Sequence, residues 1–408
     1  MSRKADLVIF GLPRWDGPFS STALSLAIEL SKEVRVFYIE NPYTIKDYVT
    51  QFWKFELRKR MMALFFGINK YQKIENNNSN LINVTPHVTL PINFLAKGKI
   101  YDYLSAINNF LVERSLASIK KDFAISSFIF INSYNPFYFK NIKRQNPICS
   151  IYHCVDNIEE SKYIGKHGSR LERSMIMDYD LTITTSRRLL DYALKLTSHS
   201  YLLPNAADFK LFEDAKNRLM GRPIELERAK GKIIGYIGSV DHRINYPLLE
   251  SVARCYPDWT LLLVGPLSKE FKTSQLNEYS NVVVVGPKPL HELPLYVKEM
   301  DCGVIPFLLN KLTESIYPLK LNEYLAVGIP IVTTHFSKDL DDFSHFIGIA
   351  ESPFDFVKLI RDEIEGDNVI KRRNRVSKAT ANSWENRVID FWKIVEPYFS
   401  LYEKERRK

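Results

Sequence analysis

Short runs of apolar residues, many of them β-branched, recur along the chain and alternate with longer amphipathic stretches. In the first half they are ADLVIFGL, EVRVFYIE, SSFIFIN, ICSIYHCV, YDLTITTS and SYLLPN, and in the second half KIIGYIGS, WTLLLVGP, NVVVVGP, DCGVIPF and IPIVTT. Runs of about four to six apolar residues between helical patterns are typical of parallel strands that helices cover on both faces. The sequence therefore predicts an α/β protein with two doubly wound sheets.

The chain divides into two predicted domains, since its 408 residues exceed the roughly 250 beyond which a single core rarely grows. The first series of strands ends near Pro204, and a polar stretch at 208–232 precedes the second series. We therefore expect a first domain at 1–207 and a second at 208–382. The remaining segment, 383–408, has apolar residues at helical spacing and is predicted to form one helix.

Several functional classes lack their sequence signatures. Glycine-containing turns follow some of the predicted strands, but none matches GxGxxG with a later acidic residue or GxxxxGK[ST]. The GxSxG, HExxH and EF-hand patterns are absent, and the four cysteines are scattered without a CxxC pair. Dehydrogenases, P-loop NTPases, hydrolases and metalloproteases are therefore disfavoured, and no structural zinc is expected.

The segment 313–334, TESIYPLKLNEYLAVGIPIVTT, is the most informative part of the sequence. Pro318 suits the first turn of a helix, Gly328 suits its end, and IPIVTT suits the following strand. Lys320 would then lie in the first turn, with Glu323 one turn further along the same face. A cation beside free backbone amides can bind a diphosphate, and a nearby carboxylate can accept hydrogen bonds from ribose hydroxyls. The alternative is an ordinary surface Lys/Glu pair.

The second half resembles the nucleotide-binding domain of GT-B glycosyltransferases, in particular group 1 and teichuronic-acid-biosynthesis-like enzymes. The matching pieces span 232–335 and are IIGYIGSV, NYPLLESVARCYPDWTLLLVGPL, NVVVVGPKPLHELPLYVKEMDCGVIPF and PLKLNEYLAVGIPIVTT. The first half resembles the same family more weakly, through LPRWDGPFSSTALSLAIELSKEVRVFYIENP, IYHCVDN, DYDLTITTS and YLLPNAAD. The resemblance implies two Rossmann-like domains facing a central cleft, the first for the acceptor and the second for the nucleotide sugar. It also implies that the C-terminal helix packs back on the first domain.

The resemblance also implies roles for individual donor-binding residues. Lys320 would contact the diphosphate and Glu323 the ribose. The residues expected to bind the nucleotide sugar are Gly238, Ser239, Arg243, Lys320, Leu321 and Glu323. Many group 1 enzymes have two glutamates eight positions apart, but Ser315 stands eight positions before Glu323, and Glu314 stands one further back. Retention or inversion of the anomeric configuration therefore stays open.

Three residues of the first half are candidates for the catalytic chemistry. Asp16 follows the first predicted strand and could be the base of an inverting reaction; alternatively it is a turn or helix-capping residue. His153 and Asp156 follow the strand ICSIYHCV, where family relatives place residues that touch the donor sugar or the acceptor. A histidine at a strand end can equally be a hydrogen-bonded structural residue.

No metal or other cofactor is expected beyond the nucleoside diphosphate sugar itself. The tripeptide Asp178-Tyr179-Asp180 has the D-x-D spacing of a metal-binding motif. It runs directly into the strand LTITTS after a predicted helix, so a pair of loop carboxylates is the preferred interpretation.

The net charge of +9 lies entirely in the first half, where residues 1–210 contain 28 Lys and Arg against 19 Asp and Glu. Cations and aromatic rings alternate along 43–73: Tyr43, Tyr48, Phe52, Trp53, Lys54, Phe55, Arg58, Lys59, Arg60, Phe65, Phe66, Lys70 and Lys73. Such a segment suits peripheral contact with an anionic membrane, or it is an amphipathic helix with a solvated basic face. No nucleic-acid-binding signature accompanies it.

We therefore expect a hexosyltransferase that transfers a sugar from a nucleoside diphosphate sugar to a cell-surface polysaccharide or lipid-linked acceptor. No run approaches the ~20 apolar residues of a membrane span, so a cytoplasmic enzyme at the inner face of the plasma membrane is expected. Two alternatives remain. A nucleotide-sugar 2-epimerase of the same fold would turn over the donor without an acceptor, and a non-catalytic relative would bind glycan or membrane only.

Overall fold

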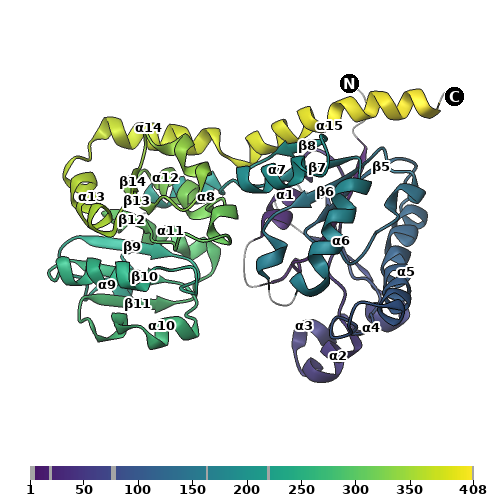
Figure 1. Ribbon diagram of the computed structural model, residues 1–408, viewed down its shortest axis with the longest axis horizontal. Coiled ribbons are helices and arrows are strands. Elements are labelled where there is room, and N and C mark those ends of the chain that lie inside the picture. The colour runs from purple at the N-terminus through teal and green to yellow at the C-terminus, as the bar shows by residue number, and fades with distance from the viewer. Residues whose placement is uncertain (1–4, 18–20, 75–79, 162–163, 218–220, 407–408) are drawn as a thin grey trace. The chain divides into compact units, whose positions relative to one another are not determined.

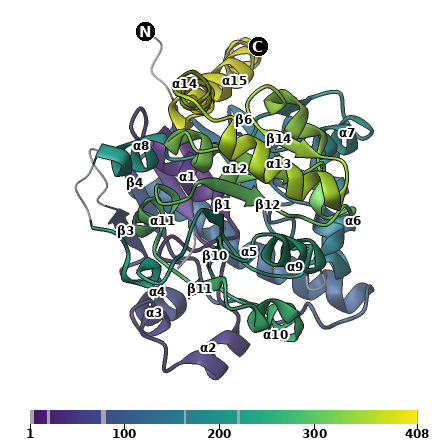
Figure 2. The ribbon, with the colours of Figure 1, turned by 90° about the vertical axis from the view of Figure 1, so that its left-hand side faces the viewer.

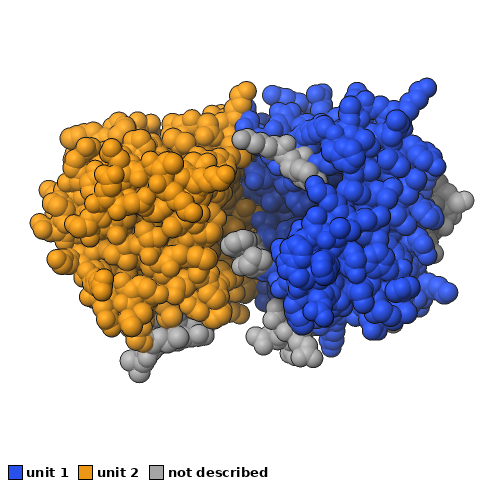
Figure 3. All heavy atoms as spheres, turned by 90° about the horizontal axis from the view of Figure 1, so that it is seen from below, with its two compact units in different colours: residues 1–203, 388–408 blue, residues 204–387 orange. Residues whose placement is uncertain are grey.

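The computed structural model describes residues 5–17, 21–74, 80–161, 164–217 and 221–406 (Figure 1). The chain forms two compact units, shown in different colours in Figure 3. Unit 1 contains Met1–Leu203 and Val388–Lys408, and unit 2 contains Pro204–Arg387. The chain thus changes unit after Leu203 and after Arg387, whereas the sequence suggests changes after residues 207 and 382.

Unit 1 is built on an eight-stranded sheet with the order β3-β4-β2-β1-β5-β6-β7-β8. Its strands are β1 (Asp6–Gly11), β2 (Val36–Ile39), β3 (Tyr71–Ile74), β4 (Leu81–Val84), β5 (Phe128–Ser133), β6 (Cys149–Cys154), β7 (Leu181–Thr184) and β8 (Ser200–Leu202). Neighbouring strands are parallel except that β3 runs antiparallel to β4 at one edge. The sequence predicted β1, β2, β5, β6, β7 and β8 but missed β3 and β4. The β3 sequence, YQKI, lacks an apolar run because two of its four residues are exposed.

Helices connect the strands of unit 1 and cover its sheet. They are α1 (Thr22–Leu30), α2 (Ile45–Gln51), α3 (Phe55–Arg58), α4 (Met61–Phe66), α5 (Lys99–Asp122), α6 (Gly165–Asp178) and α7 (Arg187–Leu194). The C-terminal helix α15 (Trp384–Arg406) begins in unit 2, and its part from Val388 onward belongs to unit 1. Its predicted apolar stripe is buried: Val388, Phe391 and Val395 are at most 2% exposed.

Unit 2 is built on a six-stranded parallel sheet with the order β11-β10-β9-β12-β13-β14. Its strands are β9 (Ile233–Ile237), β10 (Thr260–Val264), β11 (Val282–Gly286), β12 (Cys302–Ile305), β13 (Ile331–Thr334) and β14 (Gly348–Ala350). This is the doubly wound order 3-2-1-4-5-6, in which β9 and β12 lie on either side of the point where the order reverses. The sequence predicted five of these strands and missed β14, a three-residue strand, GIA, at the sheet edge.

The helices of unit 2 form two groups that pack on its sheet (Figure 2). They are α8 (Phe209–Asn217), α9 (Tyr246–Cys255), α10 (Lys269–Thr273), α11 (Leu293–Val297), α12 (Leu319–Val327), α13 (Pro353–Glu365) and α14 (Val369–Ala381). Helix α9 contacts α13, and both contact the sheet. In the other group, α12 contacts α8, α11 and α14, and α11 also contacts α8 and the strand β9. The predicted pair of doubly wound sheets is therefore confirmed.

Candidate functional site

Helix α12 carries the residues that the sequence singled out, and it ends at Gly328 as predicted, but Pro318 is its N-cap and not a residue of its first turn. Pro318 precedes its first residue, and Gly328 ends it with φ 81°, a left-handed conformation that glycine adopts without strain. Leu321, Tyr324 and Leu325 are fully buried, whereas Lys320 and Glu323 are only partly buried. Lys320 and Glu323 therefore share the accessible side of the helix, as predicted.

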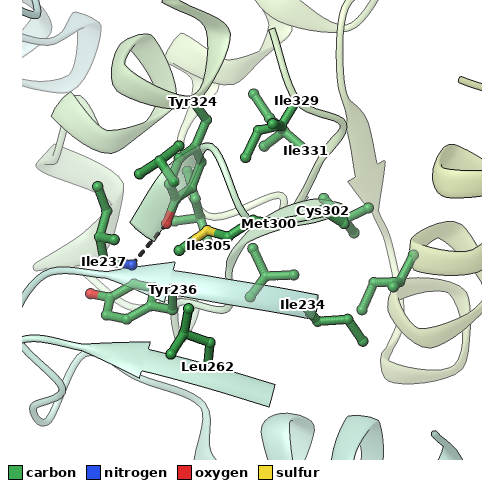
Figure 4. Packing of buried hydrophobic residues seen from close by; sticks show 14 of the residues in the cluster. Ile234, Tyr236, Ile237, Leu262, Met300, Cys302, Ile305, Tyr324, Ile329 and Ile331 are labelled. Carbon is green, nitrogen blue, oxygen red and sulfur yellow. Dashed lines mark hydrogen bonds between the residues drawn. The ribbon is translucent and has the colours of Figure 1, made fainter. Parts of the chain in front are cut away.

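The opposite side of α12 is anchored to the sheet. The backbone N–H of Ile237, the last residue of β9, donates a hydrogen bond of 2.9 Å to the hydroxyl of Tyr324 (Figure 4). The side chain of Leu321 is 0% exposed and belongs to the core of unit 2. Leu321, expected among the donor-binding residues, therefore offers a ligand no side-chain surface, and its donor-binding role stays a prediction.

Lys320 lies over the carboxyl ends of β9 and β12. Its Nζ is 5.1 Å from the ring centroid of Tyr236 in β9 and 5.0 Å from that of Phe307, which follows β12. Rings at these distances attract a cation through their π faces. Ligands of open α/β sheets bind where the strand order reverses, and Lys320 stands at that point of unit 2.

Two glycines make this approach possible. Gly238 has φ 119°, and a Cβ on it would come within 3.1 Å of Cε of Lys320. Gly265 has φ 150°, and a Cβ on it would lie 2.0 Å from the carbonyl oxygen of Gly238. The turns after β9 and β10 therefore contact each other through the backbone of Gly238 and Gly265, without side chains between them. This leaves room for the side chain of Lys320 beside Gly238.

The charges of Lys320 and Glu323 are poorly solvated. Burial, reinforced by the positive charge of Arg243, lowers the pKa of Lys320. Burial also raises the pKa of Glu323, and the charge of Lys320 only partly offsets this effect. Lys320 makes no hydrogen bond or short ion pair with any residue that the structure describes. An anionic ligand would therefore stabilise the charged form of Lys320.

Arg243 and Ser239, the other predicted donor-binding residues, flank this position. The guanidinium of Arg243 donates to both carboxylate oxygens of Asp241, at 2.9 and 2.7 Å, and lies 5.6 Å from the ring centroid of Phe307. The carbonyl oxygen of Ser239 accepts a hydrogen bond of 3.0 Å from the hydroxyl of Tyr236. Arg243 thus adds positive charge near Lys320, but Asp241 neutralises part of it.

Sequence reasoning missed Tyr236 and Phe307, whose rings flank Lys320. Both belong to strand-end segments that the sequence had identified, IIGYIGS and DCGVIPF. From the sequence, aromatic residues at these positions are equally expected in the hydrophobic core, and both are 0% exposed. Nothing in the spacing of the sequence signals that a lysine from a later helix packs against them.

His153 is a buried, neutral residue near the end of β6. It is 2% exposed, and its Nδ1 is 3.1 Å from the hydroxyl of Ser133 in β5. Burial lowers its pKa to about 4, so the ring is uncharged at neutral pH. Asp156 is more accessible, and its carboxylate accepts a hydrogen bond of 2.8 Å from the N–H of Asn157. Catalytic roles for both residues stay predictions.

Asp16 is held in an ion-pair network. Its carboxylate lies 2.6 Å from Nζ of Lys59 and 2.8 Å from a guanidinium nitrogen of Arg60. Burial alone would raise the pKa of Asp16, but the hydrogen bonds from these two cations outweigh it and lower the pKa. A carboxylate engaged in this way is a weak base, and the role of base stays a prediction. The capping alternative is wrong for α1, since the N-cap of that helix is Ser21.

Arg60 belongs to the basic segment 43–73 but is buried, unlike the solvated cations that the sequence suggested. Its side chain is 4% exposed, and its guanidinium donates to both carboxylate oxygens of the buried Glu40, at 2.7 and 2.9 Å. Glu40 also accepts from the hydroxyl of Thr85 at 2.7 Å. Arg60 is therefore a structural residue and not part of a membrane-facing surface.

The D-x-D tripeptide has structural partners. The carboxylate of Asp180 accepts from the N–H and the hydroxyl of Ser150, at 2.7 and 2.6 Å, and pairs with Lys143 at 3.0 Å. Asp178 is the last residue of α6, and Tyr179 is buried. Within the described part of the chain, no three His, Cys, Asp or Glu residues gather as a metal site would require.

Comparisons with known proteins agree with this geometry. Residues 231–350 match the family model described as glycosyl transferases group 1. Over 182 residues the chain is 28% identical to TuaH of Bacillus subtilis (strain 168), named as a teichuronic acid biosynthesis glycosyltransferase. That match covers 43% of this chain and 45% of the relative, so the chain spans less than half the length of TuaH.

Solved structures resemble the whole chain. A sucrose-phosphate synthase from Thermosynechococcus elongatus has a TM-score of 0.70 at 13% identity, with 98% of this chain and 100% of that chain covered. The E. coli structure described as trehalose-6-phosphate bound with UDP-2-fluoro glucose has a TM-score of 0.68 at 11% identity, with 96% and 99% covered. At these identities the likeness establishes the fold alone.

The fold and the comparisons define the class: this is a GT-B-fold chain. Within it, the segment 231–350 matches the model of group 1 glycosyl transferases, and this segment contains Lys320, Glu323 and the turn at Gly238. The resemblance expected from the sequence is thus confirmed for the fold and for this segment.

Proposed function

We propose that the protein is a glycosyltransferase that moves a sugar from a nucleoside diphosphate sugar to a cell-surface polysaccharide or lipid-linked acceptor. One observation carries the proposal: Lys320 lies where the strand order of the sheet of unit 2 reverses, and it forms no ion pair with a described residue. This position is inside the segment that matches group 1 glycosyl transferases. A nucleotide sugar in the E. coli structural relative and the name of TuaH support the same donor and acceptor classes.

The donor site would act mainly on the leaving group. In transfer, an acceptor hydroxyl oxygen forms a bond with the anomeric carbon, and the bond from that carbon to the phosphate oxygen breaks. The bonding electrons leave with the nucleoside diphosphate, and the hydroxyl proton goes to a base. Lys320 and the backbone N–H groups at the N-terminus of α12 would stabilise the departing negative charge. Glu323 would accept hydrogen bonds from the ribose hydroxyls, and Arg243 would add positive charge.

We further propose that this reaction needs no metal ion, because Lys320, Arg243 and the helix amides supply the positive charge that a divalent cation would otherwise provide. Sugar transfer measured with excess EDTA should match transfer measured with added magnesium. A rate that falls more than about tenfold in EDTA would contradict the proposal.

We also propose that unit 1 contacts the cytoplasmic face of the plasma membrane through α2, α3 and α4. Phe55, Val49 and Trp53 are 74%, 63% and 62% exposed. The exposed apolar residues of this region are Ile45, Val49, Phe52, Trp53, Phe55, Met61, Met62, Phe65, Phe66 and Ile68. Apolar side chains gathered in this way mark an interaction surface, and the exposed Lys54 and Arg58 would favour anionic lipid. None of the helices in the described residues is long and apolar enough to span a bilayer.

The donor proposal is tested by a thermal-shift screen of the intact chain against UDP, GDP, ADP and TDP. A ligand that binds only the native state raises its melting temperature, so one nucleotide should give a clear shift. The matching nucleotide sugar is then incubated with the protein, with and without a glycan acceptor. Turnover only with the acceptor supports transfer, turnover to a second sugar without it indicates an epimerase, and no shift with any nucleotide contradicts the proposal.

A further inference from the structure

Unit 1 has a pocket at its own switch point, where the order of its sheet reverses between β1 and β5. The pocket encloses about 370 Å³, and all of its lining residues belong to unit 1. Leu12 follows β1, Asn41 follows β2 and Asn135 follows β5. Small-molecule sites typically enclose roughly 300–1,000 Å³, so the pocket has the size of a site.

Two buried side-chain oxygens of this pocket, and Nε of Arg14, have no hydrogen-bond partner among the described residues. Asn135 is 0% exposed; its Nδ2 donates to Oδ1 of Asn41 at 2.9 Å, but its own Oδ1 has no hydrogen-bond partner among the described residues. Tyr101, on α5, is 1% exposed, and its hydroxyl makes no hydrogen bond of normal geometry with a described residue. Burial raises the pKa of Tyr101, and the nearby Ser105 hydroxyl only partly offsets this effect. The nearby Ser105 uses its oxygen to accept from Nζ of Lys140 at 2.8 Å. Buried polar groups are nearly always satisfied, so these two indicate a ligand that supplies the missing hydrogen bonds.

The pocket is nearly neutral and partly aromatic. Tyr43, Phe137 and Tyr138 line it together with the amide side chains. The carboxylate of Asp47 already accepts from the N–H and the hydroxyl of Thr44, at 2.9 and 2.8 Å. Arg14 contributes a cation, but it lies 3.6 Å from the ring centroid of Tyr43. Amides, a hydroxyl and aromatic faces suit an uncharged ring with several hydroxyl groups better than they suit a phosphate.

Helix α2 connects this pocket with the exposed apolar residues of unit 1. Asp47 and Gln51 of α2 line the pocket, whereas Val49 of the same helix and Phe52 next to it are 63% and 56% exposed. A molecule with a sugar ring in the pocket could therefore continue as a hydrocarbon chain along the surface that we propose to contact the membrane.

We propose that this pocket binds the sugar ring of a lipid-linked acceptor through Asn135 and Tyr101. The inference rests on the proposed glycosyltransferase function and adds the acceptor's place and chemistry: an uncharged sugar ring attached to a lipid.

The test is binding of methyl and octyl β-glycosides of glucose, galactose and N-acetylglucosamine to the intact chain, measured by NMR titration. Tyr101→Phe removes only the unpartnered hydroxyl, and the ring keeps its stacking on His167, with centroids 3.9 Å apart. Tyr192→Phe is the matched control, since the Tyr192 hydroxyl is also buried without a partner but lies outside the pocket. We expect at least one methyl glycoside to bind, about tenfold more weakly to Tyr101→Phe and unchanged to Tyr192→Phe.

Other results would overturn the inference. These are the absence of binding by every methyl glycoside, binding by octyl glycosides alone, and equal affinities for the two variants. Removing an unpartnered buried hydroxyl should not lower the melting temperature. If Tyr101→Phe fails to fold, Asn41→Ala is used in its place. It should also bind methyl glycosides about tenfold more weakly, and an affinity equal to that of Tyr192→Phe would overturn the inference. Binding of the preferred nucleoside diphosphate by each variant is measured in parallel. If the unaltered protein binds none of UDP, GDP, ADP and TDP, the donor proposal is contradicted, whereas loss of glycoside binding with normal nucleotide binding concerns this pocket alone.

Discussion

The switch points of the two units hold their charges differently. In unit 1, near the ends of β1 and β2, Asp16 and Glu40 are both paired with the buried Arg60. In unit 2, Lys320 lies against two aromatic rings without a carboxylate in pairing distance among the described residues. Charges that neutralise one another stabilise the fold, whereas a charge without a partner is available to a ligand. The comparison therefore supports the proposals of an anionic ligand for unit 2 and of an uncharged one for unit 1.

The largest expected effect is on the stability of unit 1. Arg60→Ala should lower the free energy of unfolding by about 3–5 kcal/mol, because it leaves the buried Glu40 without its counter-ion. Chemical denaturation measures the change. Arg58→Ala, at an exposed position of the same segment, serves as the control and should change stability by less than about 0.5 kcal/mol. A loss below about 1 kcal/mol for Arg60→Ala would contradict the view that the paired charges of unit 1 stabilise its fold.

The next effect concerns ligand binding by unit 2. Lys320→Met should weaken binding of the preferred nucleoside diphosphate about 100-fold, since it removes a charge-assisted contact from a partly desolvated site. The melting temperature should stay the same or rise, because the native state no longer holds a poorly solvated ammonium group. Calorimetry and thermal unfolding give both values. Lys358→Met, at an exposed position of α13, is the control, and equal affinities for the two variants would contradict the assignment.

Membrane contact should show a smaller, surface-specific effect. Trp53→Ser and Phe55→Ser should each reduce binding to anionic vesicles about fivefold, because each removes an exposed ring that would enter the headgroup layer. Phe354→Ser removes a ring that is 81% exposed in unit 2 and should leave vesicle binding unchanged. Co-sedimentation with vesicles measures all three. Equal losses for all three variants would mean that general apolar exposure, and not this surface, drives the binding.

The smallest effect is on proton uptake. Burial lowers the pKa of Lys320, and a bound diphosphate would shift it back towards its ordinary value of 10.5. Between the lowered and the ordinary pKa, the complex therefore binds a proton that the free protein lacks, and nucleotide affinity falls as pH rises. Calorimetry at about pH 9 in buffers with different ionisation enthalpies measures the uptake. The Lys320→Met variant should show none, and net proton release by the unaltered protein would contradict the expectation.

Local patterns in the sequence were enough to predict much of the fold and part of the site. Eleven strands were recognised from their apolar runs, and Pro318 and Gly328 marked the start and the end of α12 to within a residue. The sequence did not reveal that Arg60 is buried against Glu40, since twenty positions separate them and neither periodicity nor composition encodes such a pair. The rings beside Lys320 and the pocket at Asn135 were missed for the same reason. They depend on residues that are brought together only when distant strands and helices pack.

The hydrogen bond from Ile237 to Tyr324 has a kinetic consequence. It joins α12 to the central strand β9, so the lysine of this helix is held in place before any nucleotide arrives. Ordering the site costs conformational entropy, and this cost belongs to the folding of the chain and not to the binding of the donor. Stopped-flow mixing with nucleotide should therefore show a single association phase whose rate grows linearly with concentration. Tyr324→Phe, which frees the helix at that contact, should add a slower, concentration-independent rearrangement.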